Sequence, residues 1–215
     1  MDRMDRQERL AAGPRANGQV ARPRATATRL TFGTALPALA VLVILLMLFT
    51  PTPHLAHGIR PAFAFTLFSA LVLIVAAFIA ALVLSRSDFS VRLSFVWLPA
   101  ALILAIGVAA ELALVPREIW FARLAGTHPF ACFASVFFLS LPILAGALWA
   151  LRYGAPAHAH ATGACAGLLA GAASAALFLV HCPENSLLYT LAWHVPAVTL
   201  TAALGAIAGG RLLRG

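Results

Sequence analysis

The sequence predicts an all-α integral membrane protein, a six-transmembrane-helix bundle with its N and C termini both cytoplasmic. Three observations support this prediction. Of the 215 residues, 62% are hydrophobic and only 10% are charged, whereas soluble domains carry about a quarter charged residues. Six apolar segments reach the length of about 20 residues that crosses the hydrocarbon core of a bilayer. The arginines lie mostly on one side of these segments, which is typical of a cytoplasmic side.

Short polar or proline-rich breaks separate the six predicted spans. The spans cover approximately residues 30–49, 63–84, 91–114, 130–151, 162–180 and 187–208. The breaks between them read TPTPHLAHGIRP, SRSDFS, VPREIWFARLAGTHP, RYGAPAHAH and HCPENS. Proline interrupts a helix, and charged side chains are costly in hydrocarbon. The chain therefore divides into a flexible arginine-rich cytoplasmic arm (1–29), a transmembrane domain (30–210) and a cytoplasmic tail (211–215).

The arginine count predicts the orientation, since the chain has 15 arginines and no lysine. Six spans put both termini on one side, and that side carries twelve arginines against three on the other. Arginine-rich loops stay in the cytoplasm. We therefore predict a multi-pass protein of the bacterial inner (plasma) membrane, with the lipid bilayer as one partner. The net charge of +8 reflects this topology and favours an acidic protein partner, so no direct contact with nucleic acid is expected.

Small residues repeat every four positions on the last two spans. They are Gly163, Gly167 and Gly171 on the fifth span, and Thr201, Gly205 and Gly209 on the sixth. Small residues at this spacing form a groove that lets two helix backbones approach closely. We expect a compact bundle in which each of these spans packs tightly against a neighbour.

The last break is a short polar gap between two apolar walls. It holds three side chains able to bind a metal or react with an oxidant, His181, Cys182 and Glu184. Cys132 lies 20 residues before Arg152, and Cys182 lies 20 residues after Thr162. At a rise of ~1.5 Å per residue, both thiols lie roughly 30 Å from the inner boundary. We expect them to share one outer layer, where they can pair or share an ion, whereas Cys165 lies near the inner boundary and packs as a small hydrophobic residue.

Other metal-ligating side chains are expected at the same outer level. They are His128, Glu111, and His54 and His57 in the first outer loop. With the cysteines, this mixture suits thiophilic or borderline ions such as Cu, Zn or Cd. The ligands predicted for a transient ion are Cys132, Cys182, His181, Glu184 and Glu111, and no cofactor is required. An acid within a span is suspected of function, but Glu111 can equally reach the interface or pair with Arg117.

Motifs of catalysis are absent from the sequence. There is no Walker loop, no HExxH, no GxSxG, and no pair of carboxylates at catalytic spacing. Nor do two halves of the chain repeat each other with broken helices, as in many transporters. The sequence therefore predicts a protein that is not an enzyme.

The C-terminal half resembles a known family. From Thr162 it reads TGACAGLLAGAASAALFLVHCPENSLLYTLAWHVPAVTLTAALGAIAGGRLLR, and the helix before it reads PFACFASVFFLSLPILAGALWALRYGAP. Both segments are similar to the NrsF-like family, the negative regulators of sigma factor F. The family's features are TGxxAGLxAG, a helix ending in HCPxDS or HCPxES, a WH or WY pair, and a closing Gly/Arg-rich stretch. The resemblance is strong over 130–214 and looser over 30–129.

The resemblance implies a six-span membrane anti-sigma factor that sequesters an extracytoplasmic-function sigma factor. It further implies a stress response in which the sigma factor is released when outer-facing cysteines meet an oxidant or a heavy metal. The sensing residues would then be Cys132 and Cys182. The candidate modulators are His181, Glu184, His128, Trp193 and His194.

Two other interpretations of the same residues stay open. The first is a small metal-binding or metal-transporting membrane protein that uses the outer His/Cys cluster, which predicts a polar path through the bundle. The second is a structural subunit whose cysteines only pack. Adjacency of the gene to a sigma-factor gene distinguishes the anti-sigma interpretation from both.

Overall fold

The computed structural model describes residues 23–48, 61–85, 92, 94–154, 156–184 and 186–213. Within these residues the chain is helical and contains no strand. The long helices are α2 (Pro23–Leu48), α3 (Pro61–Leu84), α4 (Ser94–Leu114), α6 (Pro129–Leu151), α7 (Ala159–Leu179) and α9 (Val195–Leu212). The last is preceded by α8 (Leu187–Tyr189) and a π-helical turn, η4 (Thr190–His194). Six segments of the described chain are therefore long and apolar enough to cross a membrane, as the sequence predicts.

The first helix begins earlier than the sequence analysis expects, at Pro23 rather than Leu30. Proline is favoured at the first position of a helix because an N–H group at that position would have no hydrogen-bond partner within the helix. The helix therefore takes in the last residues of the predicted arm. The rest of the arm (1–22), the end of the tail (214–215) and the loop with His54 and His57 lie outside the described residues.

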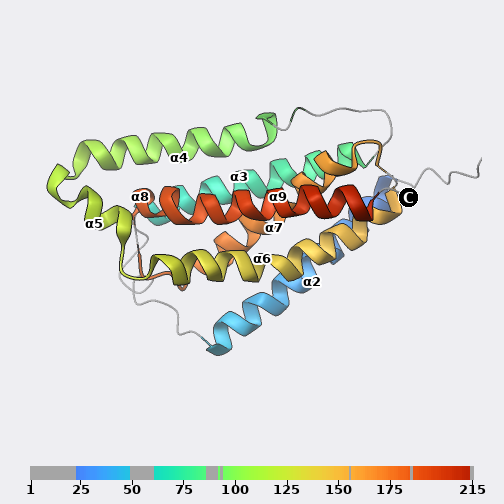
Figure 1. Ribbon diagram of the computed structural model, residues 1–215, viewed down its shortest axis with the longest axis horizontal. Helices are drawn as coiled ribbons and strands as arrows, with labels where there is room; N and C mark the ends of the chain where they lie inside the picture. The colour runs from blue at the N-terminus through green and yellow to red at the C-terminus, as the bar shows by residue number, and fades with distance from the viewer. Residues whose placement is uncertain are drawn as a thin grey trace, which may run out of the picture.

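Helix α7 occupies the centre of the bundle. It packs against α9, α3 and α6, while α2 lies outside α6 and α4 lies outside α3 (Figure 1). Most side chains of α7 are buried, and many are alanine or glycine. A helix without bulky side chains lets several neighbours approach it at once, which explains why this span rather than another is central.

The closest approach in the bundle is between α7 and α9. A Cβ atom added to Gly163 would collide with the carbonyl oxygen of Gly205, and one added to Gly167 would lie 2.6 Å from the Cα of Ala202. The two small-residue repeats found in the sequence therefore face each other. Polar side chains reinforce the contact with α6, because the hydroxyls of Ser140 and Thr201 lie 2.9 Å apart and are both buried.

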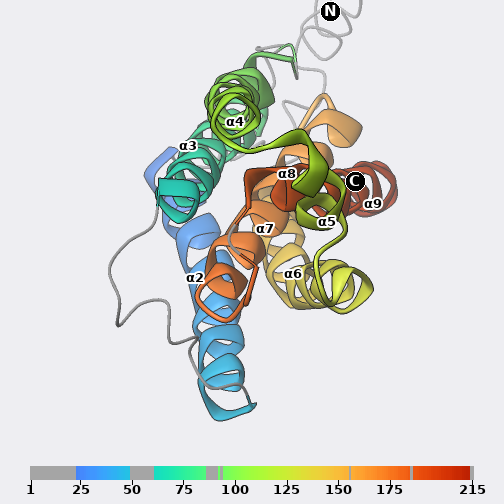
Figure 2. The same cartoon turned by 90° about the vertical axis from the view of Figure 1, so that its left-hand side faces the viewer.

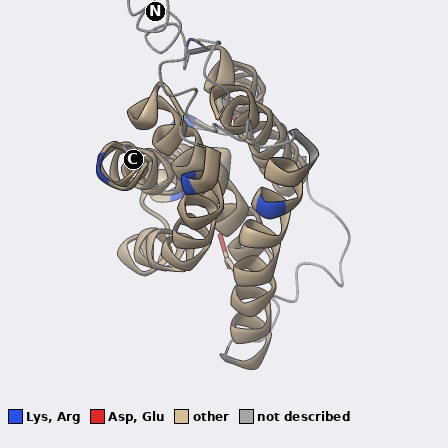
Figure 3. Ribbon diagram, turned by 90° about the vertical axis from the view of Figure 1, so that its right-hand side faces the viewer, with Lys and Arg blue, Asp and Glu red and all other residues tan. Residues whose placement is uncertain are grey.

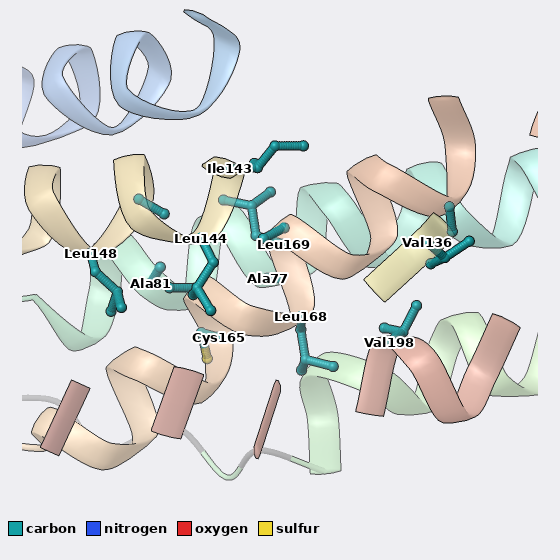
Figure 4. Packing of buried hydrophobic residues seen from close by; sticks show 14 of the residues in the cluster. Ala77, Ala81, Val136, Ile143, Leu144, Leu148, Cys165, Leu168, Leu169 and Val198 are labelled. Atoms are coloured by element: carbon teal, nitrogen blue, oxygen red, sulfur yellow. The ribbon is translucent and has the colours of Figure 1, made fainter. Parts of the chain in front are cut away.

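The apolar core runs along the whole length of α7, from Ala159 to Phe178, and continues to Cys182. Cys165 is fully buried there, near Leu144 and Leu168 (Figure 4). Large apolar side chains also cover the outside of the bundle, as expected for a surface in contact with lipid. Cys165 thus has the surroundings of a packing residue.

The two ends of the bundle differ in charge. One, here called the terminal end, holds the start of α2 and the end of α9. Its described charged side chains are basic, namely Arg29, Arg92, Arg152 and Arg211 (Figure 3). The other, here called the gap end, holds residues 180–186, α5 (Trp120–Ala125) and α8 (Figure 2). Its described acids are Glu111, Glu118 and Glu184, beside Arg117 and Arg123.

Candidate thiol site at the gap end

The gap segment, residues 180–186, turns the chain from α7 into α8. At the end of α7, the N–H groups of His181 and Cys182 both donate to the carbonyl of Phe178. Pro183 follows, and proline cannot continue the helix. Ser186 then begins α8 as its N-cap, accepting a hydrogen bond from the N–H of Tyr189. His181, Cys182 and Pro183 thus end one span, and Ser186 begins the next.

The structure brings Cys132 and Cys182 together. Their sulfur atoms lie 3.8 Å apart, and both side chains are buried, at 3% and 4% exposed. Cys132 comes from the first turns of α6 and Cys182 from the gap segment, so the depth argument from the sequence places them correctly. Hydrogen bonding to the Cys132 sulfur, together with burial, raises the pKa of the Cys182 thiol. At this separation the two thiols are close enough to form a disulfide after a small movement.

Glu111 joins the end of α4 to the start of α8. One carboxylate oxygen accepts from the N–H of Leu187 at 2.6 Å, and the other accepts from the Ser186 hydroxyl at 2.8 Å. The second oxygen also binds Arg123 at 2.8 Å. An acid at a helix N-terminus satisfies N–H groups that have no partner within the helix. Glu111 is therefore a cap for the sixth span.

The ion pair of Glu111 differs from the one considered in the sequence analysis. Its partner is Arg123 on α5, whereas Arg117 lies over the ring of Trp120, 5.7 Å from the centroid. The segment predicted as a plain loop contains a 3-10 turn, η2 (Arg117–Ile119), followed by α5. These turns carry Arg123 back over the end of α4.

A second carboxylate holds the loop after α5 on the gap segment. Glu184 accepts from both the N–H and the hydroxyl of Thr127, at 2.8 Å each. Next to it, Gly126 has φ +59°, and a Cβ atom there would collide with the Tyr189 ring. Only glycine fits this close contact without strain. Glu184 thus binds backbone and hydroxyl groups of the protein.

Trp193 and His194 leave the π-helical turn in different directions. In η4 the N–H of Val195 bonds to the carbonyl of Thr190, one residue farther back than in an α-helix. Pro196 follows and has no N–H to donate, which favours such a widened turn. The Trp193 indole donates to the carbonyl of Leu124 at 2.9 Å, on α5.

The His194 ring points to the interior. It is 3% exposed and lies against the rings of Phe178 and Tyr189, with centroids 6.4 and 5.9 Å away. Neither of its ring nitrogens has hydrogen-bond geometry with a partner among the described residues, but the imidazole interacts with the Cys132 thiol. The Tyr189 hydroxyl donates to the carbonyl of His128. The sequence analysis did not identify Tyr189 as a residue of the site. The available signal was Ser186, a typical N-cap residue, which places Tyr189 in the first turn of the following helix.

The predicted metal ligands do not gather into one set. Among the described residues, no three His, Cys, Asp or Glu side chains are placed to hold an ion together. Glu111 and Glu184 bind protein groups, the His128 side chain is exposed, and His181 is buried in the gap. The structure therefore brings together the two cysteines and His194. Glu111 and Glu184 instead bind groups of neighbouring segments and stabilise the packing at the gap end.

The fold and the site define a helical bundle of the membrane-spanning type with a buried dithiol at one end. Residues 15–214 match the family described as "Negative regulator of sigma F" (NrsF), and the chain belongs to that family. It is 37% identical over 84 residues to the "Anti-sigma-F factor NrsF" of Caulobacter vibrioides, a stretch that is 39% of each chain. It is 31% identical over 127 residues to the "Probable anti-sigma-F factor NrsF" of Azospira oryzae.

The match with the second relative covers 55% of this chain and 58% of the relative. The chain thus spans well under two thirds of the length of the curated relatives it matches. No solved structure matches it.

Proposed function

We propose that this chain is a membrane anti-sigma factor that binds an extracytoplasmic-function sigma factor at its terminal end. The sigma factor is released when Cys132 and Cys182 are oxidised. The role is regulatory rather than catalytic. Family membership and the names of the two relatives support the anti-sigma role. The 3.8 Å separation of the two buried sulfur atoms is the observation that supports sensing by thiols.

The charge distribution supports the assignment of the two ends. The described side chains of the terminal end are basic, which favours both a cytoplasmic position and an acidic partner. The gap end then faces the outside of a bacterial inner membrane, where an oxidising compartment permits a disulfide. Oxidation at one end would alter binding at the other through α7, which begins at the terminal end and leads directly into Cys182.

Oxidation fits the described site better than metal binding does. A disulfide needs only two thiols, whereas a structural zinc site needs four ligands, and no three candidate ligands gather among the described residues. Heavy-metal stress stays part of the proposal as a second inducer that reaches the same two thiols. The two inducers are compared in the experiment below.

The experiment is co-expression of the chain with the sigma factor of a neighbouring gene and a promoter that this sigma factor reads. The wild-type chain should silence the promoter, and peroxide should restore transcription. Cys132→Ser and Cys182→Ser should each silence the promoter and remain insensitive to peroxide, because neither retains a thiol pair. The same strains treated with Cd(II) show whether metal induction needs both thiols.

Cys165→Ser is the matched control. Cys165 is buried in the core near the terminal end of the bundle, so this substitution should leave induction intact. All variants should appear in the membrane fraction at similar amounts. A promoter that is indifferent to deletion and overexpression of the chain contradicts the anti-sigma role. Normal induction in both outer cysteine variants contradicts only the sensing site.

A further inference from the structure

His194 is a buried imidazole whose chemistry the packing of the bundle does not explain. Its side chain is 3% exposed, and its two ring nitrogens have no partner with hydrogen-bond geometry among the described residues. Buried polar groups in native proteins are nearly always hydrogen-bonded, so an exception needs an explanation, and a redox or catalytic role is one that these groups are known to have. Aromatic rings on α7 and α8 hold the imidazole in place, since Phe178 and Tyr189 both contact it edge to face.

The imidazole lies beside one thiol of the pair. The Tyr189 ring that packs on His194 reaches the turn that carries Cys132, because the carbonyl of His128 accepts hydrogen bonds from both the Tyr189 hydroxyl and the N–H of Cys132. Cys132 interacts electrostatically with His194, whereas Cys182 interacts with both the backbone N–H and the carboxylate of Glu184. A basic nitrogen near Cys132 favours its thiolate, and a negative charge near Cys182 opposes a second one.

We propose that His194 is the proton acceptor for Cys132, which makes Cys132 the attacking thiol and Cys182 the resolving thiol of the pair. The proposal rests on the proposed function, because it describes how the sensing thiols react. His194 is a positioning and proton-transfer residue, placed by the π-helical turn. Without the extra residue that this turn accommodates, the side chain would leave the helix in another direction.

The reaction with a hydroperoxide balances as follows. A ring nitrogen of His194 takes the proton of the Cys132 thiol. The thiolate attacks one peroxide oxygen, the O–O bond breaks, and the leaving oxygen takes the proton back from the imidazolium as water or alcohol. Cys132 is then a sulfenic acid. The Cys182 sulfur attacks the Cys132 sulfur, the S–S bond forms, the S–O bond breaks, and the leaving hydroxide takes the proton of the Cys182 thiol and departs as water. The two thiols have then lost two electrons to the peroxide.

Other titratable groups lie on the elements packed around His194. They are Cys132 and His128 on and before α6, His181, Cys182 and Glu184 in the gap segment, Tyr189 on α8, and the Glu111–Arg123 pair. The acids are bound to protein groups, so the imidazole is the buried group best placed to exchange a proton with Cys132.

The test follows disulfide formation in the purified full-length protein in detergent, with hydrogen peroxide as the oxidant. A Cys165→Ser background leaves only the two relevant thiols, and a maleimide mass tag counts those still free. His194→Gln should slow the reaction by about 10²-fold at pH 7, because a positioned base contributes a factor of this order. The loss should shrink as the pH approaches 9.5, where hydroxide removes the thiol proton without help.

The control is His158→Gln, the same substitution at an exposed histidine at the terminal end, which should react at the wild-type rate. A His194→Gln rate that is unchanged, or reduced equally at every pH, overturns the proposal and leaves His194 a packing residue. If the parent protein forms no disulfide with peroxide at any pH, the proposed thiol sensing itself fails. The role of His194 and the sensing by thiols can therefore be rejected independently of each other.

A second measurement does not depend on how well a His194 variant folds. Dimedone, which traps sulfenic acid, should label the Cys182→Ser variant after peroxide treatment, because Cys132 is oxidised and cannot be resolved. It should label Cys132→Ser at least tenfold less under the same conditions, a ratio of the order expected from thiolate availability. Equal labelling of the two variants overturns the assignment of Cys132 as the attacking thiol.

Discussion

At the scale of single residues, the gap end depends on two carboxylates with structural partners. Glu111 is 7% exposed at its side chain, and its oxygens accept hydrogen bonds from the start of α8 and from Arg123. Glu184 binds Thr127 and so holds the loop after α5. An acid inside a span invites a functional interpretation. Here its bonding partners explain Glu111 as the cap of α8, at the start of the sixth span.

Glu111→Gln is predicted to destabilise the protein without changing the chemistry of the thiols. The amide keeps the shape but loses the ion pair and offers one acceptor oxygen in place of two. The expected cost is about 1–3 kcal/mol, the usual range for an unsatisfied buried group. Thermal unfolding in detergent, followed by tryptophan fluorescence, measures it. Glu118→Gln, at an exposed acid on η2, is the control and should unfold at the wild-type temperature. Equal stability of the two variants would contradict the capping role.

At the scale of elements, the contact between α7 and α9 organises the bundle. Gly163 and Gly167 on α7 face Gly205 and Thr201 on α9, with backbone atoms in direct contact. The thiol site depends on this contact. Helix α7 ends at the gap segment with Cys182, and the chain that becomes α9 carries His194. A change in the distance between α7 and α9 therefore changes the site.

Gly205→Leu is predicted to separate α7 from α9 and to abolish the folded bundle. The added side chain would collide with the carbonyl of Gly163, a backbone atom that cannot move aside. Overpacking of this kind costs about 1–3 kcal/mol or more. Ala203→Leu places the same leucine side chain on the exposed face of α9, and this variant should insert and elute normally. Size-exclusion chromatography in detergent compares the two, and a normal Gly205→Leu profile would show that the contact is dispensable.

At the scale of the whole molecule, the orientation in the membrane remains a prediction. Alternating helices put the start of α2 and the end of α9 at the same end of the bundle (Figure 1). The basic side chains described at that end favour the cytoplasm. The thiol site would then lie about one membrane thickness, roughly 30 Å, away from the proposed binding site for the sigma factor.

Reporter fusions test this orientation directly. Alkaline phosphatase folds into its active form only outside the cytoplasm, so a fusion after Arg214 should be inactive. A green fluorescent protein fusion at the same position should be fluorescent. An active phosphatase there would reverse the molecule and place the thiols in the reducing cytoplasm, which removes the physical basis for a stable disulfide.

The sequence alone determined the number of long helices, their approximate limits, the small-residue faces of α7 and α9, and the common level of the two outer cysteines. These features follow from hydrophobic length, helical rise and residue size, which are local properties of the chain. They do not depend on how the neighbouring helices pack.

The tertiary structure decided which polar groups meet. Three interactions join residues far apart in the sequence: the ion pair of Glu111 with Arg123, the hydrogen bonds of Glu184 with Thr127, and the packing of the His194 ring against Phe178. They depend on α5 folding back over the end of α4 and on the π-helical turn that directs His194 inward. Neither a short helix in a loop nor one extra residue in a turn changes the hydrophobic pattern of the chain. Only the packed bundle therefore distinguishes the residues that cap helices from those that face the thiols.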